Sequence, residues 1–326
     1  MSRFFGFLTA ATLARRLGVD GFGQIGFASA VLTYGVILTD FGLLTVGTRA
    51  VASDPREASK TLGRILPIRL ILGLASALFI VVFAVVLPRP VGVRSLLAVY
   101  AGAVVAQALL LEWFFFGSEQ MGVVASARIL MHLSYYVLVL LLVRGPQDIL
   151  SVPFGFIGST LLAVLLLFIS YRSRFGRPSL RFVRAEWVNV IRQAWPIGAA
   201  GVFTQMHVNF GPVGLGLLRS DSETGLYSAA FRLVFFLLAL DRVFHTVFFP
   251  VVSRIWVNRP DRVSELIGTA LRLILVVSLP LSTGLALLAR PTLAAVFGPN
   301  YVTAASALRL LVPFVPVSML SSMAGY

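Results

Sequence analysis

The sequence has no cysteine and few acidic residues. The absence of cysteine among its 326 residues excludes disulfide frameworks, thiolate metal sites and cysteine nucleophiles. Only 13 residues are Asp or Glu, and charged residues make up 12% of the chain against about a quarter in soluble domains. Because 58% of the residues are apolar, most side chains should face lipid or each other. The composition predicts an integral membrane protein and excludes an ordinary soluble enzyme.

Lysine is almost absent too, since Lys60 is the only one and the other basic residues are arginines. The net charge of +14 would fit a nucleic-acid-binding protein. However, the arginines lie in short runs between apolar stretches, which is typical of loops anchored at one membrane face. We therefore expect membrane lipid as a partner and no nucleic acid.

The apolar residues form about ten long stretches. A membrane-spanning helix needs about 20 mostly apolar residues, and the stretches lack the two-residue alternation of barrel strands. The sequence predicts an all-α polytopic membrane protein with about ten transmembrane helices. The stretches are Phe4 to Ala14, Phe22 to Leu44, Ile65 to Leu87, Ser95 to Phe116, Val123 to Val143, Ile149 to Ile169, Trp195 to Leu218, Leu226 to Phe249, Leu271 to Ala289 and Ala304 to Met323.

The basic residues are divided unequally between alternate loops. Loops after the second, sixth and eighth stretches hold thirteen, and the opposite loops hold five, or seven with Arg15 and Arg16. Cytoplasmic loops carry the excess of positive charge, so we expect a multi-pass protein of the inner membrane with its N-terminus in the cytoplasm. The thirteen are Arg49, Arg56, Lys60, Arg64, Arg172, Arg174, Arg177, Arg181, Arg184, Arg192, Arg254, Arg259 and Arg262.

The first stretch also has the proportions of a signal peptide, because Arg3 precedes an eleven-residue apolar run. Arg15 and Arg16 directly after the run argue against cleavage there. No segment outside the membrane exceeds roughly 25 residues, so a separate soluble catalytic domain is not expected.

A weak internal repeat relates the two halves. Gly23 to Ala28 resembles Gly225 to Ala230 at an offset of 225 − 23 = 202, and this offset carries the second and third stretches roughly onto the eighth and ninth. We expect an N-terminal six-helix lobe over 1–170 with a shortened first helix and a basic cytoplasmic linker over 171–193. The C-terminal lobe over 194–326 would then be incomplete, with four helices, so the chain would be part of a twelve-helix, two-lobe parallel-repeat transporter.

Motifs for cofactors and metals give no positive prediction. Gly21 to Gly26 matches the glycine pattern of dinucleotide-binding loops, but no strand precedes it and it opens an apolar helix, which indicates close helix packing instead. Lys60 follows no phosphate-binding loop, so ATP hydrolysis by that route is not expected. His132, His207 and His245 lack the spacing of a zinc site and act either in helix packing or in a proton relay. We expect no cofactor and no metal.

Charged residues inside the predicted spans are the candidate substrate-binding residues, since each is costly in lipid and should face a partner or a water-filled cavity. Arg69, Arg272 and Arg309 lie near helix ends, and we interpret them as snorkelling to the surface. The remaining cavity candidates are Asp40, Glu112, Arg128, His132, Arg232, Asp241, Arg242 and His245.

Two groups stand out among these candidates. Glu112 and Arg128 lie eight residues either side of Gln120 in the tight turn Gly117 to Gly122, so antiparallel helices would place them at equal depth, with His132 one turn from Arg128. In the second half, Asp241 and His245 share a helix face beside Arg242.

Arginines outnumber acids at membrane depth in this interpretation. A guanidinium binds phosphate in bidentate fashion, which favours an anionic substrate. Arg128 and Arg232 lie in different halves, and we expect them to bind a diphosphate in a cavity between the lobes. The alternative is that both arginines only pair with acids such as Glu112 and Asp241.

Several motifs resemble a known family. They are Leu17 to Gly23, the helix end Thr39 to Leu43, Thr48-Arg49, Glu112-Trp-Phe-Phe-Phe-Gly117 with Glu119 to Met121, and Gly225 to Ala230. Together they are similar to the Wzx-type oligosaccharide flippases of polysaccharide biosynthesis, in the multidrug, oligosaccharidyl-lipid and polysaccharide exporter superfamily. The resemblance implies two six-helix lobes around a central cationic cavity, outward passage of an undecaprenyl-diphosphate-linked sugar, and no ATPase activity.

The function expected from the sequence is therefore that of a flippase. It would move a lipid-linked oligosaccharide across the inner membrane for surface polysaccharide or O-antigen synthesis, alongside glycan-assembly proteins. A multidrug-type or other polysaccharide exporter of the same superfamily is the close alternative, although a cavity for cationic drugs should hold more acids than bases. A membrane-embedded glycosyltransferase or polymerase is the alternative from another class, and would need acid-base residues in a long external loop.

Overall fold

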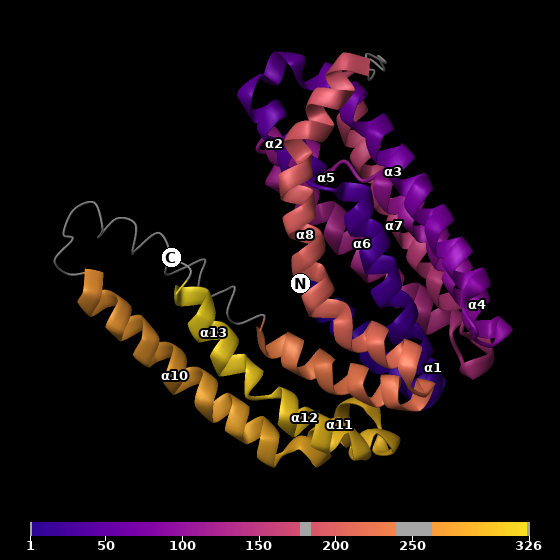
Figure 1. Cartoon of the computed structure of the whole chain (residues 1–326), viewed down its shortest axis with the longest axis vertical. Coiled ribbons are helices and arrows are strands. Elements are labelled where there is room, and N and C mark those ends of the chain that lie inside the picture. The colour runs from indigo at the N-terminus through magenta and orange to yellow at the C-terminus, as the bar shows by residue number, and fades with distance from the viewer. Residues whose placement is uncertain (1, 177–183, 239–262, 325–326) are drawn as a thin grey trace. The chain divides into compact units, whose positions relative to one another are not determined.

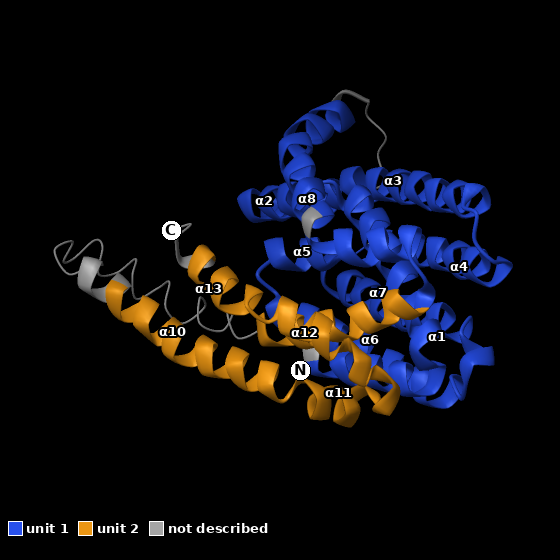
Figure 2. Cartoon of the chain, turned by 60° about the horizontal axis from the view of Figure 1, so that its bottom comes forward, with its two compact units in different colours: residues 1–221 blue, residues 222–326 orange. Residues whose placement is uncertain are grey.

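Nearly all of the residues described by the computed structural model, which are 2–176, 184–238 and 263–324, are helical. No strand occurs among them, and the all-α membrane fold predicted from the sequence is confirmed. The chain divides into two packing units, Met1–Asp221 and Ser222–Tyr326 (Figure 2).

The first element, α1 (Ser2–Asp40), consists of two helical segments that meet at Gly18. Gly18 has φ 72° and ψ −175°, a backbone conformation that is open to glycine at no steric cost. Arg16, at the end of the first segment, donates to the carbonyls of Leu140 and Val143 at the end of α6 (Met121–Leu142). The second segment runs along α8 (Arg184–Leu218). The break separates the first two predicted stretches.

The remaining helices of unit 1 pack around α1. After α2 (Leu43–Ser53) come α3 (Ala58–Val86) and α4 (Val91–Ala108), which lie side by side (Figure 1). The chain continues through α5 (Glu112–Gly117) and α6 to α7 (Ser151–Phe175), which packs along α6. Short 3-10 turns precede α3 and α7, at Pro55–Glu57 and Pro146–Asp148.

The fourth predicted stretch is a broken helix in the structure. Residues 109–111 interrupt it, so α4 ends at Ala108 and α5 begins at Glu112. A break at membrane depth is tolerated where protein groups satisfy the backbone, and here the amides of Leu109 and Leu110 bond back to the carbonyls of Ala106 and Gln107.

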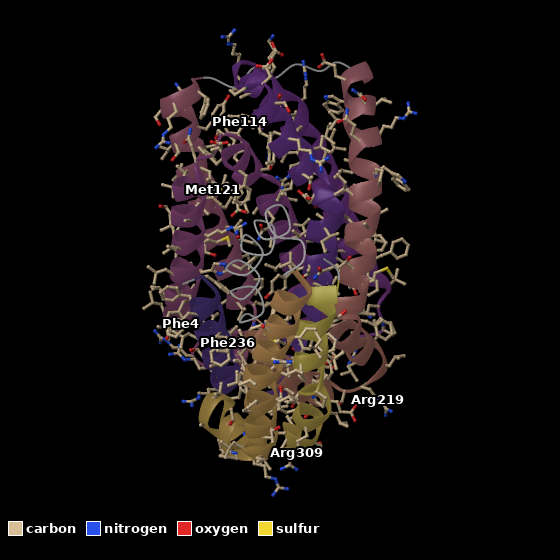
Figure 3. All side chains as sticks on the ribbon, turned by 90° about the vertical axis from the view of Figure 1, so that its left-hand side faces the viewer. Phe4, Phe114, Met121, Arg219, Phe236 and Arg309 are labelled. Atoms are coloured by element: carbon tan, nitrogen blue, oxygen red, sulfur yellow. The ribbon has the colours of Figure 1, made fainter. Side chains whose placement is uncertain are left out.

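The two ends of unit 1 are tied by polar contacts. At one end Arg64 of α3 lies 2.7 Å from Glu186 of α8, and Tyr171 of α7 donates to Ser59 at 3.1 Å. The loops after the second and sixth predicted stretches therefore lie at the same end, as expected. At the other end Arg89 lies 3.4 Å from Asp221; Figure 3 shows Phe114 and Arg219 toward these opposite ends.

Residues 221–238 are helical, and unit 2 begins within this helix at Ser222. It continues with α10 (Val263–Leu287) and α11 (Ala289–Phe297). The turn η4 (Pro299–Ala304), α12 (Ala305–Leu311) and α13 (Phe314–Ala324) follow. α13 packs against α10.

Helix ends in the two units agree with the expected repeat. Adding 202 to the end of α3 at Val86 gives 288, and α10 ends at Leu287. Adding 202 to the break at 109–111 gives 311–313, which matches the interruption between α12 and α13. The offset found from two short motifs therefore holds for a helix break that the sequence analysis did not predict.

Each of the ten predicted stretches overlaps a helix. Seven helices within the described ranges are long and apolar enough to cross a membrane. The lobe boundaries at 170 and 194 stay a prediction, because the units of the structure reflect packing and not the repeat.

Candidate functional site

Glu112 and Arg128 form a two-bonded ion pair inside unit 1. Arg128 donates from Nε to Glu112 Oε1 at 2.8 Å and from Nη2 to Oε2 at 2.7 Å, the fork geometry in which a guanidinium binds a carboxylate. The Glu112 side chain is 16% exposed and the Arg128 side chain 46%. The pairing expected from the turn symmetry is confirmed, and the arginine is its more accessible partner.

The pair is held in place by an aromatic core and a tight turn. Trp113, Phe114 and Phe115 directly follow Glu112 and are fully buried, so α5 has little freedom to shift. The turn between α5 and α6 spans residues 118–120, with Glu119 at φ 57°. This short connection brings Arg128, two turns into α6, back beside Glu112.

Small residues let α5 approach α2 closely. A Cβ added at Gly47 would lie 2.4 Å from Trp113 Cε3, and one added at Gly117 would lie 2.6 Å from the Thr48 carbonyl. Thr48 also donates to the Trp113 carbonyl at 3.0 Å. Two of the family-like motifs, around Thr48 and from Glu112 to Gly117, thus pack on each other.

Two further side chains lie near the pair. The Arg128 guanidinium lies 5.4 Å from the ring centroid of Phe116, within the range of a cation–π interaction. His132 lies one turn along α6 from Arg128 and is half-buried.

Arg69 does not snorkel to the surface, so the expectation for this residue is wrong. Its side chain is 8% exposed, and Nη1 donates to the Leu110 carbonyl at 3.1 Å, inside the break between α4 and α5. Nη2 lies 3.7 Å from Asp40 Oδ1. Asp40 also accepts a bond from the Leu44 amide at 3.1 Å. The position of Arg69 near a predicted helix end suggested an exposed side chain. The break in the neighbouring helix instead provides a buried acceptor, the Leu110 carbonyl.

The charges at membrane depth in the described part of unit 1 balance. Asp40 and Glu112 face Arg69 and Arg128, two acids against two bases. The surplus of arginine expected at this depth is therefore absent from this set. The four charges lie on α1, α3, α5 and α6 and form two ion pairs, Asp40 with Arg69 and Glu112 with Arg128.

Unit 2 contains the other candidates. Arg232 lies half-buried in the helical residues 221–238, and its role at a substrate stays a prediction. Arg272 and Arg309 are exposed, and Arg309 donates to the Ala286 carbonyl at 3.1 Å, in keeping with the surface position expected of them. Three candidates lie outside the described residues: Asp241, Arg242 and His245.

A polar cluster that the sequence analysis missed lies at the end of α8. Arg89 donates to the carbonyls of Gly216 and Arg219, the latter at 2.9 Å, and pairs with Asp221. Gln24 donates to the same carboxylate at 2.9 Å. The cluster joins loop 87–90 and α1 to the end of α8, and no local sequence pattern connects positions so far apart in the chain.

Comparison with known proteins decides the family. A sequence profile of the polysaccharide biosynthesis protein family matches residues 1–256. The chain belongs to this family. Among curated proteins it is 21% identical over 239 residues to a “Putative O-antigen transporter” of Shigella dysenteriae, with 70% of this chain aligned. The chain spans 58% of that relative's length.

Solved structures show the fold of this polysaccharide biosynthesis protein. An inward-facing multidrug resistance MATE family transporter of the MOP superfamily matches 99% of this chain and 79% of its own, with a TM-score of 0.75 and 15% identity. An outward-facing structure of a MATE family transporter matches 98% and 77% with a TM-score of 0.55 and 15% identity. The chain therefore has a MATE-type transporter fold, and its resemblance to the Wzx-type members of that superfamily is confirmed.

Proposed function

We propose that this protein is a flippase that moves a lipid-linked oligosaccharide, carried on undecaprenyl diphosphate, outward across the inner membrane. Its N-terminus would lie in the cytoplasm, because the arginine-rich loops share one end of unit 1. Family membership and the MATE-type fold support transport in polysaccharide synthesis. The substrate class rests on the chemistry of the charged groups.

The observation that carries the proposal is the accessibility of Arg128. A guanidinium that donates two hydrogen bonds to a carboxylate can bind two phosphate oxygens with the same geometry. Because nearly half of the Arg128 side chain is exposed, a diphosphate approaching in the membrane interior can compete with Glu112 for the same donors. The Glu112 carboxylate then occupies the position that the substrate phosphate would take.

The charge balance argues against a cationic drug as substrate. Both Asp40 and Glu112 already face arginines, so neither carboxylate offers an uncompensated negative charge to a cation. A drug exporter remains the closest alternative because its fold is the same. It would require removal of an arginine partner before either acid could bind a cation.

A glycosyltransferase or polymerase is less well supported. Such an enzyme needs acid-base groups displayed to a bound sugar, whereas the loops of unit 1 at the end opposite Arg64 are only a few residues long, at 87–90 and 143–150. We therefore propose transport without a chemical change of the sugar.

The membrane potential would assist this transport. An interior-negative potential favours outward movement of an anion by about 2.3 kcal/mol per charge per 100 mV, or roughly twice that for a diphosphate with two charges. Release to the outside is thus favoured electrically. Engagement with Arg128 would offset part of the cost of bringing the headgroup into the membrane.

The experiment is complementation in a bacterium whose own O-antigen flippase has been deleted. Expression of this protein should restore surface polysaccharide, and Arg128→Gln should not, while the exposed loop variant Arg144→Gln should match the wild type. Ethidium efflux in the same strains separates the alternatives. Ethidium efflux above that of the deletion strain, without restored polysaccharide, would favour the exporter and contradict the flippase.

A further inference from the structure

Arg69 has a buried donor without a partner. Its Nε is fully buried and has no hydrogen-bond partner among the described residues, although Nη1 bonds the Leu110 carbonyl and Nη2 faces Asp40. A buried donor on a charged group that has no acceptor destabilises the folded state. An arrangement that brought an acceptor to this donor would remove the penalty.

The acceptor for that arrangement lies close by. Glu112 begins α5 two residues after Leu110, the residue whose carbonyl Arg69 binds. The Leu110 carbonyl that Arg69 binds at 3.1 Å thus places the start of α5 next to the Arg69 guanidinium. Glu112 is therefore bonded to Arg128 and follows closely in the chain on the residue that binds Arg69.

We propose that Glu112 exchanges between these two arginines. In the structure it is paired with Arg128, and when a diphosphate engages Arg128 the carboxylate turns to Arg69 and accepts from its free Nε. The inference deepens the proposed function, on which its substrate step rests. Arg69 is then a positioning residue that lets Arg128 release its internal partner without leaving a buried carboxylate unpaired.

Physical reasoning supports the exchange. Removing one partner of a buried ion pair leaves an uncompensated charge, which is strongly unfavourable. If Arg128 bound the substrate and Glu112 had no other partner, this cost would oppose binding. Pairing of Glu112 with Arg69 would lower that cost, so substrate binding becomes a swap of anions on Arg128.

The first test needs no substrate. The coupling between positions 69 and 112 is measured by a double-mutant cycle of Arg69→Lys and Glu112→Gln, from unfolding equilibria in mixed micelles. The cycle is run in the wild type and in an Arg128→Gln background, with Arg144→Gln as the matched control background. Lysine keeps the charge at position 69 but lacks the Nε donor, so it is the variant expected to fold.

The exchange predicts different couplings in these backgrounds. Glu112 should couple weakly to Arg69 in the wild type and in Arg144→Gln, and at least tenfold more strongly, as a factor in the unfolding equilibrium constant, in Arg128→Gln. An Arg69 that only holds the helix break through Leu110 gives the same coupling in all three backgrounds. Equal couplings would overturn the proposal whatever the substrate is.

The second test adds the headgroup. Undecaprenyl diphosphate in lipid nanodiscs is titrated against the protein, and undecaprenol serves as the neutral probe. Binding is followed by the fluorescence of Trp113, in a variant whose other three tryptophans are replaced by phenylalanine. Arg69→Lys should weaken binding at least tenfold when Glu112 is present and leave it unchanged in Glu112→Gln. Equal weakening in both backgrounds would contradict the exchange, whereas equal binding of both probes by the wild type would contradict the proposed function.

Discussion

Gly47 of α2 lies against the indole ring of Trp113, so closely that an added Cβ would be 2.4 Å from the ring atom Cε3. Trp113 directly follows Glu112 and is fully buried. Contact with Gly47 thus fixes the position of α5, and with it the carboxylate that Arg128 binds. Helix association in lipid depends on such close packing at small residues, because lipid tails are as apolar as the side chains.

Gly47→Ala should therefore destabilise the protein by about 1–3 kcal/mol, the usual cost of overpacking a buried contact. Unfolding in mixed micelles measures this change. Gly122→Ala is the matched control, because no atom lies within 4 Å of a Cβ added there, and it should leave stability unchanged or slightly higher. Equal effects of the two substitutions would show that the Gly47 contact is unimportant.

The Glu112 and Arg128 pair should behave as one unit. Arg128→Ala should cost about 1–3 kcal/mol, less than a fully buried pair would, because the arginine is 46% exposed. Glu112→Arg combined with Arg128→Glu should recover part of the folded yield lost in either single variant. A double variant no better than the worse single one would argue against direct pairing in the membrane.

Arg69 and Arg309 should differ sharply although both were expected to snorkel. Arg69→Met leaves Asp40 and the Leu110 carbonyl without their buried partner and should cost about 3–5 kcal/mol. Arg309→Met removes an exposed side chain and should change stability little. The comparison uses folded yield and the unfolding midpoint, and similar losses in both variants would count against a buried Arg69.

The orientation can be read with cysteine labelling, since the chain has no cysteine of its own. Arg56 and Gln147 are both exposed and lie in the two 3-10 turns of unit 1. Arg56→Cys should resist an impermeant thiol reagent in intact cells and Gln147→Cys should react, because the arginine-rich end is expected in the cytoplasm. The reverse labelling pattern would invert the topology.

Much of this architecture was predictable because it follows from composition and period. Each apolar stretch overlaps a helix, and the offset of 202 from two short motifs holds for the end of α10. The Glu112 and Arg128 pair was predictable as well, since a short turn between antiparallel helices places residues at equal distances from its centre side by side. These features depend on residues that are close together in the sequence, so they can be predicted without knowing how distant helices pack.

The buried position of the Arg69 side chain could not be predicted in this way. Its partners, Asp40 and Leu110, come from α1 and from a helix break, and the break at 109–111 contains no proline or glycine to indicate it. The cluster of Arg89, Asp221 and Gln24 was missed for the same reason. Contacts between distant helices depend on packing that no window of sequence contains.

The most direct test of the flippase account is headgroup movement in liposomes containing only the purified protein. The probe is an undecaprenyl-diphosphate-linked oligosaccharide with a fluorescent sugar, and dithionite quenches label on the outer leaflet. The account predicts that with the wild type nearly all of the label becomes accessible to dithionite, and that Arg128→Lys slows the exchange. With Arg128→Gln about half of the label should stay protected, as in protein-free liposomes whose two leaflets share the probe equally. Full exchange by a well-folded Arg128→Gln variant would contradict the role of Arg128, and no exchange by the wild type would contradict the function itself.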